Sequence, residues 1–208
     1  MYNQNFPSAF FITGTDTGIG KTAISAMLAQ GLNATYWKPI QAGLDEETDI
    51  QFVQRTTNLP DSHFIAERFR LQTPMSPHAA AEIDDVSIQL DDFTLPEYGT
   101  KHLVVEGAGG LMVPINDEDM IIDLISYLSL PVVLVSRSTL GTLNHTFLSL
   151  EALRKRNIPI LGVVLNGPKS ESNRKAIEKY GEIRILAEIE PIDEINSESL
   201  QTNFDEHF

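Results

Sequence analysis

The feature that most constrains the fold is a glycine-rich turn between an apolar run and a helical pattern near the start of the chain. Residues 10–12 are apolar and typical of a buried strand, and residues 23–30 have the composition of a helix. Between them lies GTDTGIGKT, which spans residues 14–22. Glycines in such a turn let backbone N–H groups surround phosphate oxygens, and the following helix N-terminus favours negative charge. The sequence therefore predicts a loop that binds the phosphates of a nucleoside triphosphate.

The spacing of this loop departs from the commonest phosphate-binding pattern. Five residues rather than four separate Gly14 from Gly20, while Lys21 and Thr22 keep the places of the phosphate-binding amine and the Mg²⁺-binding hydroxyl. An ordinary strand-to-helix turn is the simpler alternative. The strand before the loop and the helix after it favour the phosphate-binding interpretation. The extra residue restricts the chain to fewer families of phosphate-binding proteins.

Apolar runs alternate with helical patterns along the rest of the chain. The expected strands cover residues 10–13, 34–37, 102–106, 132–136, 160–165 and 183–189, and the expected helices cover residues 22–31, 48–57, 119–129, 143–156 and 170–180. This alternation predicts a three-layer α/β sandwich, with a mostly parallel sheet and helices on both faces. A length of 208 residues, 42% of them hydrophobic, suits a single domain over residues 1–208.

Two segments lack a clear pattern. Residues 60–99 contain four prolines and are expected to form loops that border a substrate, with one helix at residues 85–93. Residues 198–208 are polar and acidic, and we expect this end of the chain to fray.

Charge and cysteine content exclude several classes of protein. Fifteen basic residues stand against 29 acidic ones, giving a formal charge of −14 that repels nucleic acid and anionic membranes. The chain has no cysteine, which excludes disulfides, thiolate metal sites and cysteine nucleophiles. No run of 18 apolar residues occurs, and residues 1–7 lack the features of an export signal. These observations predict a cytoplasmic protein without nucleic-acid or membrane partners.

Two carboxylates are candidates for holding Mg²⁺ beside the phosphate loop. Glu106 ends an apolar strand pattern and is followed by the glycine-rich segment Gly107, Ala108, Gly109 and Gly110, which would let a ligand approach the backbone. Asp49 follows Thr48 at an expected helix start. From the residues alone, helix capping explains Asp49 better than metal binding.

Lysines are rare in the first half of the chain. Lys21 and Lys38 are the only two before residue 100, and Lys38 directly follows an expected strand at the same sheet edge as the phosphate loop. A surface charge is the simpler interpretation of Lys38. Because lysines are so rare in this part of the chain, the sharper hypothesis is that Lys38 is a second cationic group that binds anions in the site. We do not expect the side chain of either Lys21 or Lys38 to lie in the core.

Six motifs in order carry a family resemblance. They are GTDTGIGKT, KPIQAG from residue 38, TDI from residue 48, MSPH from residue 75, VEGAGG from residue 105 and LGTLNH from residue 140. Together they resemble the dethiobiotin synthetase family. The resemblance implies a homodimeric P-loop enzyme that uses ATP, CO₂ and Mg²⁺ to close the ureido ring of dethiobiotin from 7,8-diaminopelargonic acid.

The resemblance also implies roles for particular residues. Catalysis would rest on Lys21, Lys38 and Thr17, and Mg²⁺ would lie between Thr22, Asp49 and Glu106, which reverses the capping interpretation of Asp49. The nucleotide would contact Gly18, Ile19, Gly20, Lys21, Thr22, Asp49, Glu106, Gly107, Ala108, Gly109 and Asn166, with Asn166 reading the purine. The substrate would meet Ala42, Ser76, Pro77, His78 and Gly110, and also Leu140, Gly141 and Asn144 of the partner subunit. From the residues alone, Asn144 is better explained as a helix cap.

Three positions depart from the family pattern. Ala42 replaces a hydroxyl residue, Gly18 replaces a frequent glutamate, and the segment from Leu186 to Pro191 lacks the usual LGxIP sequence. Base recognition is therefore less firmly predicted than phosphate binding.

Two other classes of protein remain open. A partitioning ATPase of the MinD or ParA kind would carry an extra lysine early in the loop, where this chain has Thr15, Asp16 and Thr17. A small-molecule kinase would need a cationic lid, yet only three arginines lie between Lys38 and Lys101.

Overall fold

The computed structural model describes residues 6–208 and contains a parallel sheet in the order β4-β2-β6-β1-β7-β8-β9. Its strands are β1 Ala9–Gly14, β2 Thr35–Trp37, β4 Phe64–Ile65, β6 Leu103–Gly110, β7 Val132–Arg137, β8 Ile160–Asn166 and β9 Ile185–Ile189. Residues 1–5, on which part of the export-signal prediction rests, lie outside the described range.

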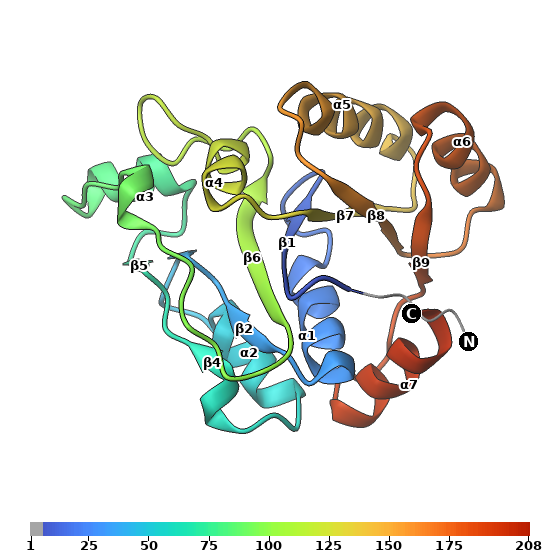
Figure 1. The fold of residues 1–208 in the computed structure, drawn as a ribbon, viewed down its shortest axis with the longest axis horizontal. Coiled ribbons are helices and arrows are strands. Elements are labelled where there is room, and N and C mark those ends of the chain that lie inside the picture. Colours follow the sequence, from blue (N-terminus) through green and yellow to red (C-terminus); the bar gives the residue numbers. More distant parts are fainter. Residues whose placement is uncertain (1–5) are drawn as a thin grey trace.

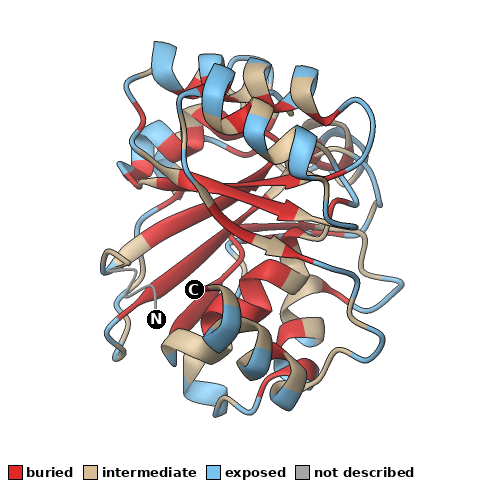
Figure 2. Cartoon of the chain, turned by 90° about the vertical axis from the view of Figure 1, so that its right-hand side faces the viewer, coloured by how far each residue is buried: buried red, intermediate tan, exposed pale blue. Residues whose placement is uncertain are grey.

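Helices cover both faces of this sheet (Figure 1). On one face lie α1 Lys21–Leu32, α2 Asp49–Thr56 and α7 Ser197–His207, and on the other lie α4 Ile121–Leu128, α5 Thr142–Lys155 and α6 Glu171–Gly181. The strands are buried between the two helical layers, whose outer surfaces are exposed (Figure 2). The predicted three-layer α/β sandwich is confirmed.

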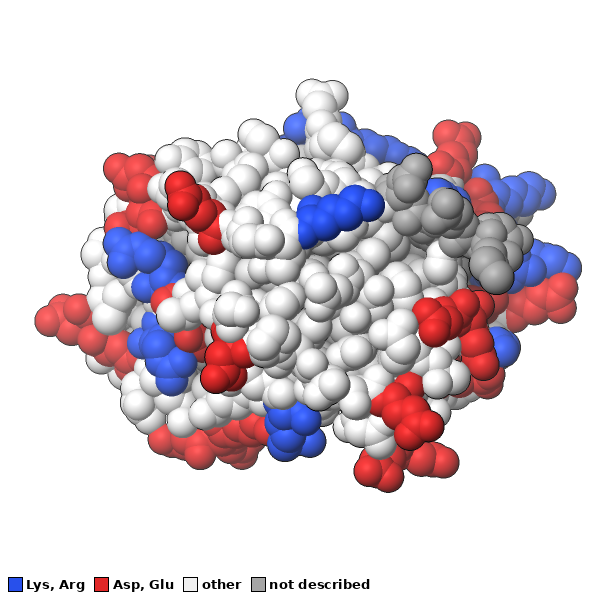
Figure 3. Space-filling view, turned by 60° about the horizontal axis from the view of Figure 1, so that its bottom comes forward, with Lys and Arg blue, Asp and Glu red and all other residues white. Residues whose placement is uncertain are grey.

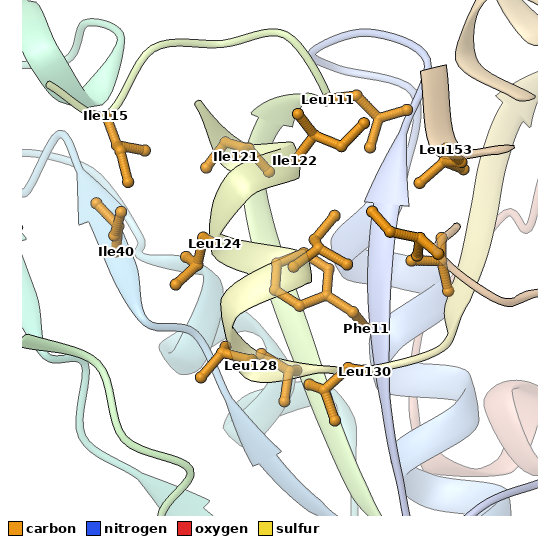
Figure 4. Close-up of a cluster of buried hydrophobic side chains, with 14 of the residues drawn as sticks. Phe11, Ile40, Leu111, Ile115, Ile121, Ile122, Leu124, Leu128, Leu130 and Leu153 are labelled. Carbon is orange, nitrogen blue, oxygen red and sulfur yellow. The ribbon is translucent and has the colours of Figure 1, made fainter. Parts of the chain in front are cut away.

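Successive side chains along each strand point to opposite faces of the sheet and pack into the two parts of the core, one on each face. Phe10 points to the α1 face and Phe11 to the α4 face, and both are fully buried. Figure 4 shows Phe11 beside α4, whose Ile121 and Leu124 belong to the same buried cluster. Complete burial of each such side chain stabilises the fold by roughly 1.5–3 kcal/mol, so the sheet is fixed from both sides.

The strand order determines where ligands can bind. Strand β6 pairs with both β1 and β2, so the chain reverses its direction of winding at β1. In parallel sheets of this kind ligands bind beyond the carboxyl ends of the strands at such a reversal. The phosphate loop, Lys38 and Glu106 all belong to this edge. Strand β6 also continues through Gly110, so residues 107–110 extend the strand beyond its predicted end at residue 106.

Residues 60–99 are more regular than predicted. Strand β5 Phe69–Leu71 pairs with β3 Ile40–Ala42 in a small second sheet, and α3 spans Pro77–Ile83. Two short 3₁₀ turns cover Asp61–His63 and Leu90–Asp92. The predicted helix at residues 85–93 is wrong. The helix begins earlier because proline suits a first helical position, and the backbone turns left-handed at Asp85, with φ of 54°.

The prediction that residues 198–208 fray is also wrong, because they belong to α7. Asn196 caps this helix by accepting hydrogen bonds from the N–H groups of Glu198 and Ser199. Leu200 and Phe208 are buried, and the Phe204 ring fills the space beside Gly31, where any Cβ atom would collide with it. The apolar residues, spaced one helical turn apart, dock α7 against α1.

The surface carries mixed charge. On the face drawn in Figure 3, basic side chains are interspersed with acidic ones and do not gather into one patch. No helix within residues 6–208 combines the length and hydropathy needed to cross a lipid bilayer.

Candidate functional site

The phosphate loop ends in a helix N-terminus with free backbone donors. Gly18 and Gly20 have φ values of 69° and 88°, in the left-handed region that glycine adopts without strain. Gly20 precedes the first residue of α1 and provides no side-chain cap. The first N–H groups of α1 are therefore available to an anion, and the helix dipole favours negative charge there.

Lys21, the first residue of α1, lies inside the site. Its side chain is largely buried, and its Nζ donates a hydrogen bond to the Asp16 carbonyl oxygen at 3.0 Å. Burial lowers the pKa of this amine, although the negative charge of Glu106 opposes the shift. The Lys21 amine is thus held close to the loop whose bound phosphates it would contact.

Lys38 lies between two carboxylates just after β2. Its Nζ is 2.5 Å from Asp49 Oδ2 and 3.2 Å from Glu106 Oε1, and only 5% of the residue is exposed. Burial favours the neutral amine, but the charges of Glu106 and Asp49 outweigh it and raise the pKa of Lys38. The prediction that Lys21 and Lys38 lie outside the core is therefore wrong, because buried carboxylates compensate their charges.

The Thr22 hydroxyl connects the two carboxylates. Its Oγ1 lies 2.5 Å from Asp49 Oδ1 and 2.8 Å from Glu106 Oε1. A hydroxyl has one proton and can donate to one acceptor at a time. The three oxygen-bearing side chains that the sequence predicted to surround Mg²⁺ are thus in direct contact.

Asp49 is free to face the site because another residue caps its helix. Thr48 is the N-cap of α2, and its hydroxyl accepts from the N–H of Gln51. The Asp49 N–H donates instead to the side-chain oxygen of Gln41. Burial raises the pKa of Asp49, but Lys38 and Thr22 outweigh this and leave it lowered. The capping interpretation of Asp49 is wrong, because Thr48 already caps the helix.

Glu106 is fully buried within β6 and is held from two sides. Oε1 faces Thr22 and Lys38, whereas Oε2 accepts a hydrogen bond from the Tyr36 hydroxyl at 2.9 Å. Burial and the charge of Glu106 raise the pKa of Tyr36 well above its ordinary value, so the phenol stays protonated as a donor. Sequence reasoning missed Tyr36, because an aromatic residue in a strand is typical of core.

These groups line a cleft with a volume of about 750 Å³. The predicted site residues that line it are Thr17, Gly18, Gly20, Lys21, Thr22, Lys38, Ala42, Asp49, Ser76, Pro77, Glu106, Ala108 and Gly109. Gln41, Phe52, Met75 and Val113 line it as well and were not predicted. Met75 is half exposed and lies with Pro74 to Pro77 at the approach to α3. The structure thus brings the phosphate and substrate motifs into one cavity.

Comparisons with known proteins agree with this geometry. A family model described as an AAA domain matches residues 8–199. The ATP-dependent dethiobiotin synthetase BioD of Rhodopseudomonas palustris (strain BisB5) is 48% identical over 197 residues, covering 95% of this chain and 92% of that protein. BioD of Brucella ovis is 43% identical over 201 residues, covering 97% and 94%. The chain belongs to the dethiobiotin synthetase family.

One relative of this synthetase family is longer. The biotin biosynthesis bifunctional protein BioCD of Bordetella avium is 50% identical over 195 residues, which cover 93% of this chain and 42% of that protein. The chain therefore spans less than half the length of this relative.

The solved structures that resemble the chain share its fold at low identity. A ParA family ATPase from Chlorobium tepidum matches with a TM-score of 0.55 and 13% identity, covering 97% of this chain and 90% of that one. A putative plasmid partition protein from Borrelia burgdorferi matches with a TM-score of 0.58 and 12% identity, covering 97% and 96%. At such identities the likeness shows the fold alone. The similarity to partitioning ATPases is therefore a similarity of fold and gives no support to a partitioning function.

In this member of the synthetase family the early part of the loop carries an ion pair. Arg137, at the end of β7, lies 2.5 Å from Asp16 Oδ2, and the other Asp16 oxygen accepts from the N–H of Thr17. Arg137 and Asp16 therefore fix the early part of the loop from outside the cleft.

Several residues that the synthetase resemblance implied do not line the cleft. Gly107 is buried beneath the Phe11 ring, which leaves no room for a Cβ atom. His78 lies on the far side of α3, in a second depression, although its Nδ1 is 3.1 Å from the Ser76 hydroxyl. Gly110 borders the depression between the phosphate loop and α5. Ile19 is buried in the core.

Asn166 contacts the phosphate loop directly. It ends β8, and its Nδ2 donates to the Ile19 carbonyl at 2.9 Å. A Cβ atom on Gly20 would collide with the same amide. Asn166 thus braces the loop without lining the cleft, and its predicted contact with a purine stays a prediction.

The last predicted substrate residues lie at the exposed start of α5. Gly141 precedes this helix with φ of 93° and provides no side-chain cap. Asn144 is exposed in the first turn, so it is not the N-cap that the residues alone indicated. Leu140 is fully exposed. These residues are absent from the cleft lining of their own chain.

Proposed function

We propose that the cleft catalyses closure of the ureido ring of dethiobiotin from 7,8-diaminopelargonic acid, CO₂ and ATP, releasing ADP and phosphate. As a member of the family, the chain is an ATP-dependent ligase of biotin biosynthesis. The observation that carries the proposal is the convergence of Lys21, Lys38, Thr22, Asp49 and Glu106 on one cavity beside a phosphate loop. We regard residues 1–208 as one synthetase domain, and the cytoplasmic location stays a prediction.

The loop and α1 are suited to binding the ATP phosphates. Gly18 to Thr22 would surround them, because the N–H groups of the first helical turn lack intrahelical acceptors. Lys21 would exchange the Asp16 carbonyl for a phosphate oxygen. Its buried amine then interacts more strongly with the anion than a solvated one would.

The donor set fits Mg²⁺. Thr22, Asp49 and Glu106 would hold it, as a hydroxyl and two carboxylates. Within residues 6–208 no cluster of three or more acidic, histidine or cysteine side chains is arranged to bind a metal. That fits Mg²⁺, which is usually held by one or two carboxylates together with substrate phosphates. When bound, the ion neutralises charge that develops on the phosphates.

The reaction needs positioning and charge compensation more than a protein nucleophile. One substrate amine attacks CO₂ and loses a proton, giving a carbamate whose oxygen attacks the γ-phosphorus as the bond to ADP breaks. The second amine then attacks the carbamate carbon, expels phosphate and loses its proton. Lys38 would compensate the carbamate charge and Thr17 would line the reacting centre, so both act by orientation and electrostatics.

The rest of the cleft would hold the diamine. Ser76, Pro77 and Gly109 form walls beside Ala42, whose methyl group leaves that side without a hydroxyl contact. Met75 adds a half-exposed apolar surface suited to an aliphatic chain.

A second copy of the chain would complete the site. The uncapped start of α5, with Leu140, Gly141 and Asn144, has free N–H donors suited to a carboxylate and does not reach its own cleft. Exposed Met112 and Leu148 lie beside this region and offer apolar surface for contact. We therefore propose a homodimer in which α5 of one chain meets the substrate in the cleft of its partner.

Incubation with diaminopelargonate, isotopically labelled bicarbonate, Mg²⁺ and ATP tests the proposal. Mass spectrometry should detect labelled dethiobiotin in amounts matching ADP and phosphate, because each ring closure consumes one ATP. Omission of the diamine should abolish the product and most ATP turnover. A phosphorylated diamine without ring closure would show a kinase instead, and folded protein that forms no product would remove the proposal.

A further inference from the structure

The two oxygens of Glu106 have different neighbours. Oε1 faces the cleft, where it lies 2.8 Å from Thr22 Oγ1 and accepts from Lys38 Nζ at 3.2 Å. Oε2 faces away from it and accepts from Tyr36 Oη at 2.9 Å. The torsion that turns a carboxylate about its last bond is only weakly restricted, so the chain itself does not decide which oxygen points outward. The neighbouring donors must decide it.

Tyr36 is rigidly placed to do this. It lies in β2, opposite Val104 of β6, so its side chain shares the α1 face with that of Glu106 two residues further along β6. Its ring is fully buried in the core on that face. Packing fixes the ring, and the ring fixes the direction of the hydroxyl.

The hydroxyl has no packing role that a phenylalanine would not fill. Burying an unpaired hydroxyl costs free energy, and this one is compensated by its bond to Glu106. Removing it would leave Oε2 of a fully buried carboxylate without this donor. The contact therefore serves the carboxylate as much as the core.

We propose that Tyr36 is a positioning residue that holds Oε2 of Glu106 and keeps Oε1 turned toward Thr22 and the cleft. The inference rests on the proposed role of Glu106 as a Mg²⁺ ligand. Groups that orient a metal-binding carboxylate in this way typically change metal affinity by about 10–100-fold when they are removed. Tyr36 thus acts on the metal through Glu106, without contacting it.

Thermal unfolding of Tyr36→Phe in ADP, followed over a range of MgCl₂ concentrations, tests this inference. The half-saturating MgCl₂ concentration for stabilisation should rise at least about tenfold relative to the parent. Thr35→Val is the matched control. Thr35 is the preceding residue of β2, is equally buried, and its hydroxyl pairs at 2.9 Å with Thr100 rather than with the site. It should lower the unfolding temperature without moving the MgCl₂ midpoint.

The possible outcomes separate the inference from the function on which it rests. If the parent responds to MgCl₂ and Tyr36→Phe responds at the same midpoint, Tyr36 is only a core residue. If the parent itself shows no response in ADP, the proposed metal role is lost, and this inference with it. A crystal structure of the parent with ADP and Mg²⁺ needs no variant. Tyr36 Oη must stay within hydrogen-bonding distance of Oε2 there, and a separation would overturn the inference.

Discussion

Helices α1 and α5 begin alike and end up in opposite surroundings. Each follows a glycine with a left-handed backbone, φ of 88° at Gly20 and 93° at Gly141, and neither has a side-chain cap. At α1 the free donors face a cleft completed by Lys38, Asp49 and Glu106. At α5 they sit beside fully exposed Leu140. The same local geometry thus lies in a lined cleft in one place and on an exposed surface in the other, where we propose that a partner subunit completes the site.

The difference teaches that a helix N-terminus acquires chemistry from what the fold brings to it. Around α1 the sheet supplies the carboxyl ends of β1, β2 and β6. Around α5 the described residues supply no comparable set of buried charges, which is why we propose that it acts together with a partner subunit. Three changes would break or sharpen this contrast.

Lys38→Met should have the largest effect. It removes the cation between Asp49 and Glu106, and a loss on the order of 3 kcal/mol of transition-state stabilisation corresponds to about a hundredfold in kcat. Because the lysine is buried between carboxylates, the free energy of unfolding should fall as well, by roughly 3–5 kcal/mol. Steady-state kinetics and urea unfolding measure the two effects.

Lys175→Met is the control, because it removes an exposed lysine paired with Glu171 on α6. It should change neither quantity measurably. A Lys38→Met enzyme that turned over at the parent rate would show that the α1 cleft does not depend on this cation.

Mixing two variants tests whether the two helix starts meet across a dimer. Lys38→Met and Asn144→Ala should each be nearly inactive alone. After exchange at equal amounts, half of the dimers are mixed and each holds one intact site, so activity should recover to about a quarter of the parent value. Native mass spectrometry verifies exchange. If exchange occurs without recovery, Asn144 acts within its own chain and the contrast drawn here fails.

Asp49→Asn removes a carboxylate that we propose to hold Mg²⁺, and the smallest of the effects expected here is its change in the pH dependence of stability. Burial raises the pKa of Asp49, but Lys38 and Thr22 lower it by a larger amount. The pKa in the folded protein therefore lies below the unfolded value of about 3.9. The stability that this carboxylate contributes is present above the unfolded pKa and is lost as pH falls through the folded one. Urea unfolding from pH 7 down to about pH 3 should therefore show a steeper loss in the parent than in the variant.

Asp91→Asn, at an exposed position, is the control for this titration. It should keep the steep loss of the parent. Parallel curves for the parent and Asp49→Asn would show that Lys38 and Thr22 do not hold the Asp49 carboxylate in its charged form.

The sequence predicted the groups that belong to local motifs and missed those that depend on register between strands. Lys21, Thr22 and Glu106 could be found because each occupies a fixed place after a strand or in a loop. Tyr36 could not, because its contact with Glu106 depends on how β2 and β6 align. Gln41 could not either, since its bond to the Asp49 backbone forms only once α2 has docked.

The same reasoning explains the errors in the fold. Strand β5 and helix α3 are short and are stabilised by tertiary contacts, so proline content alone indicated loops. Helix α7 is polar overall, and its few buried residues become visible only against α1. Long apolar strands needed no such context, and their order of appearance predicted the sandwich.

The docking of α7 has a practical consequence for handling the protein. Helix α1 presents the phosphate loop at one end, and at its other end Phe204 of α7 packs beside Gly31. Proteolysis within the last turn of α7 during purification would separate Phe204 from Gly31 and loosen this contact. Such a preparation would resemble one with a damaged nucleotide site, although every residue of the cleft was intact.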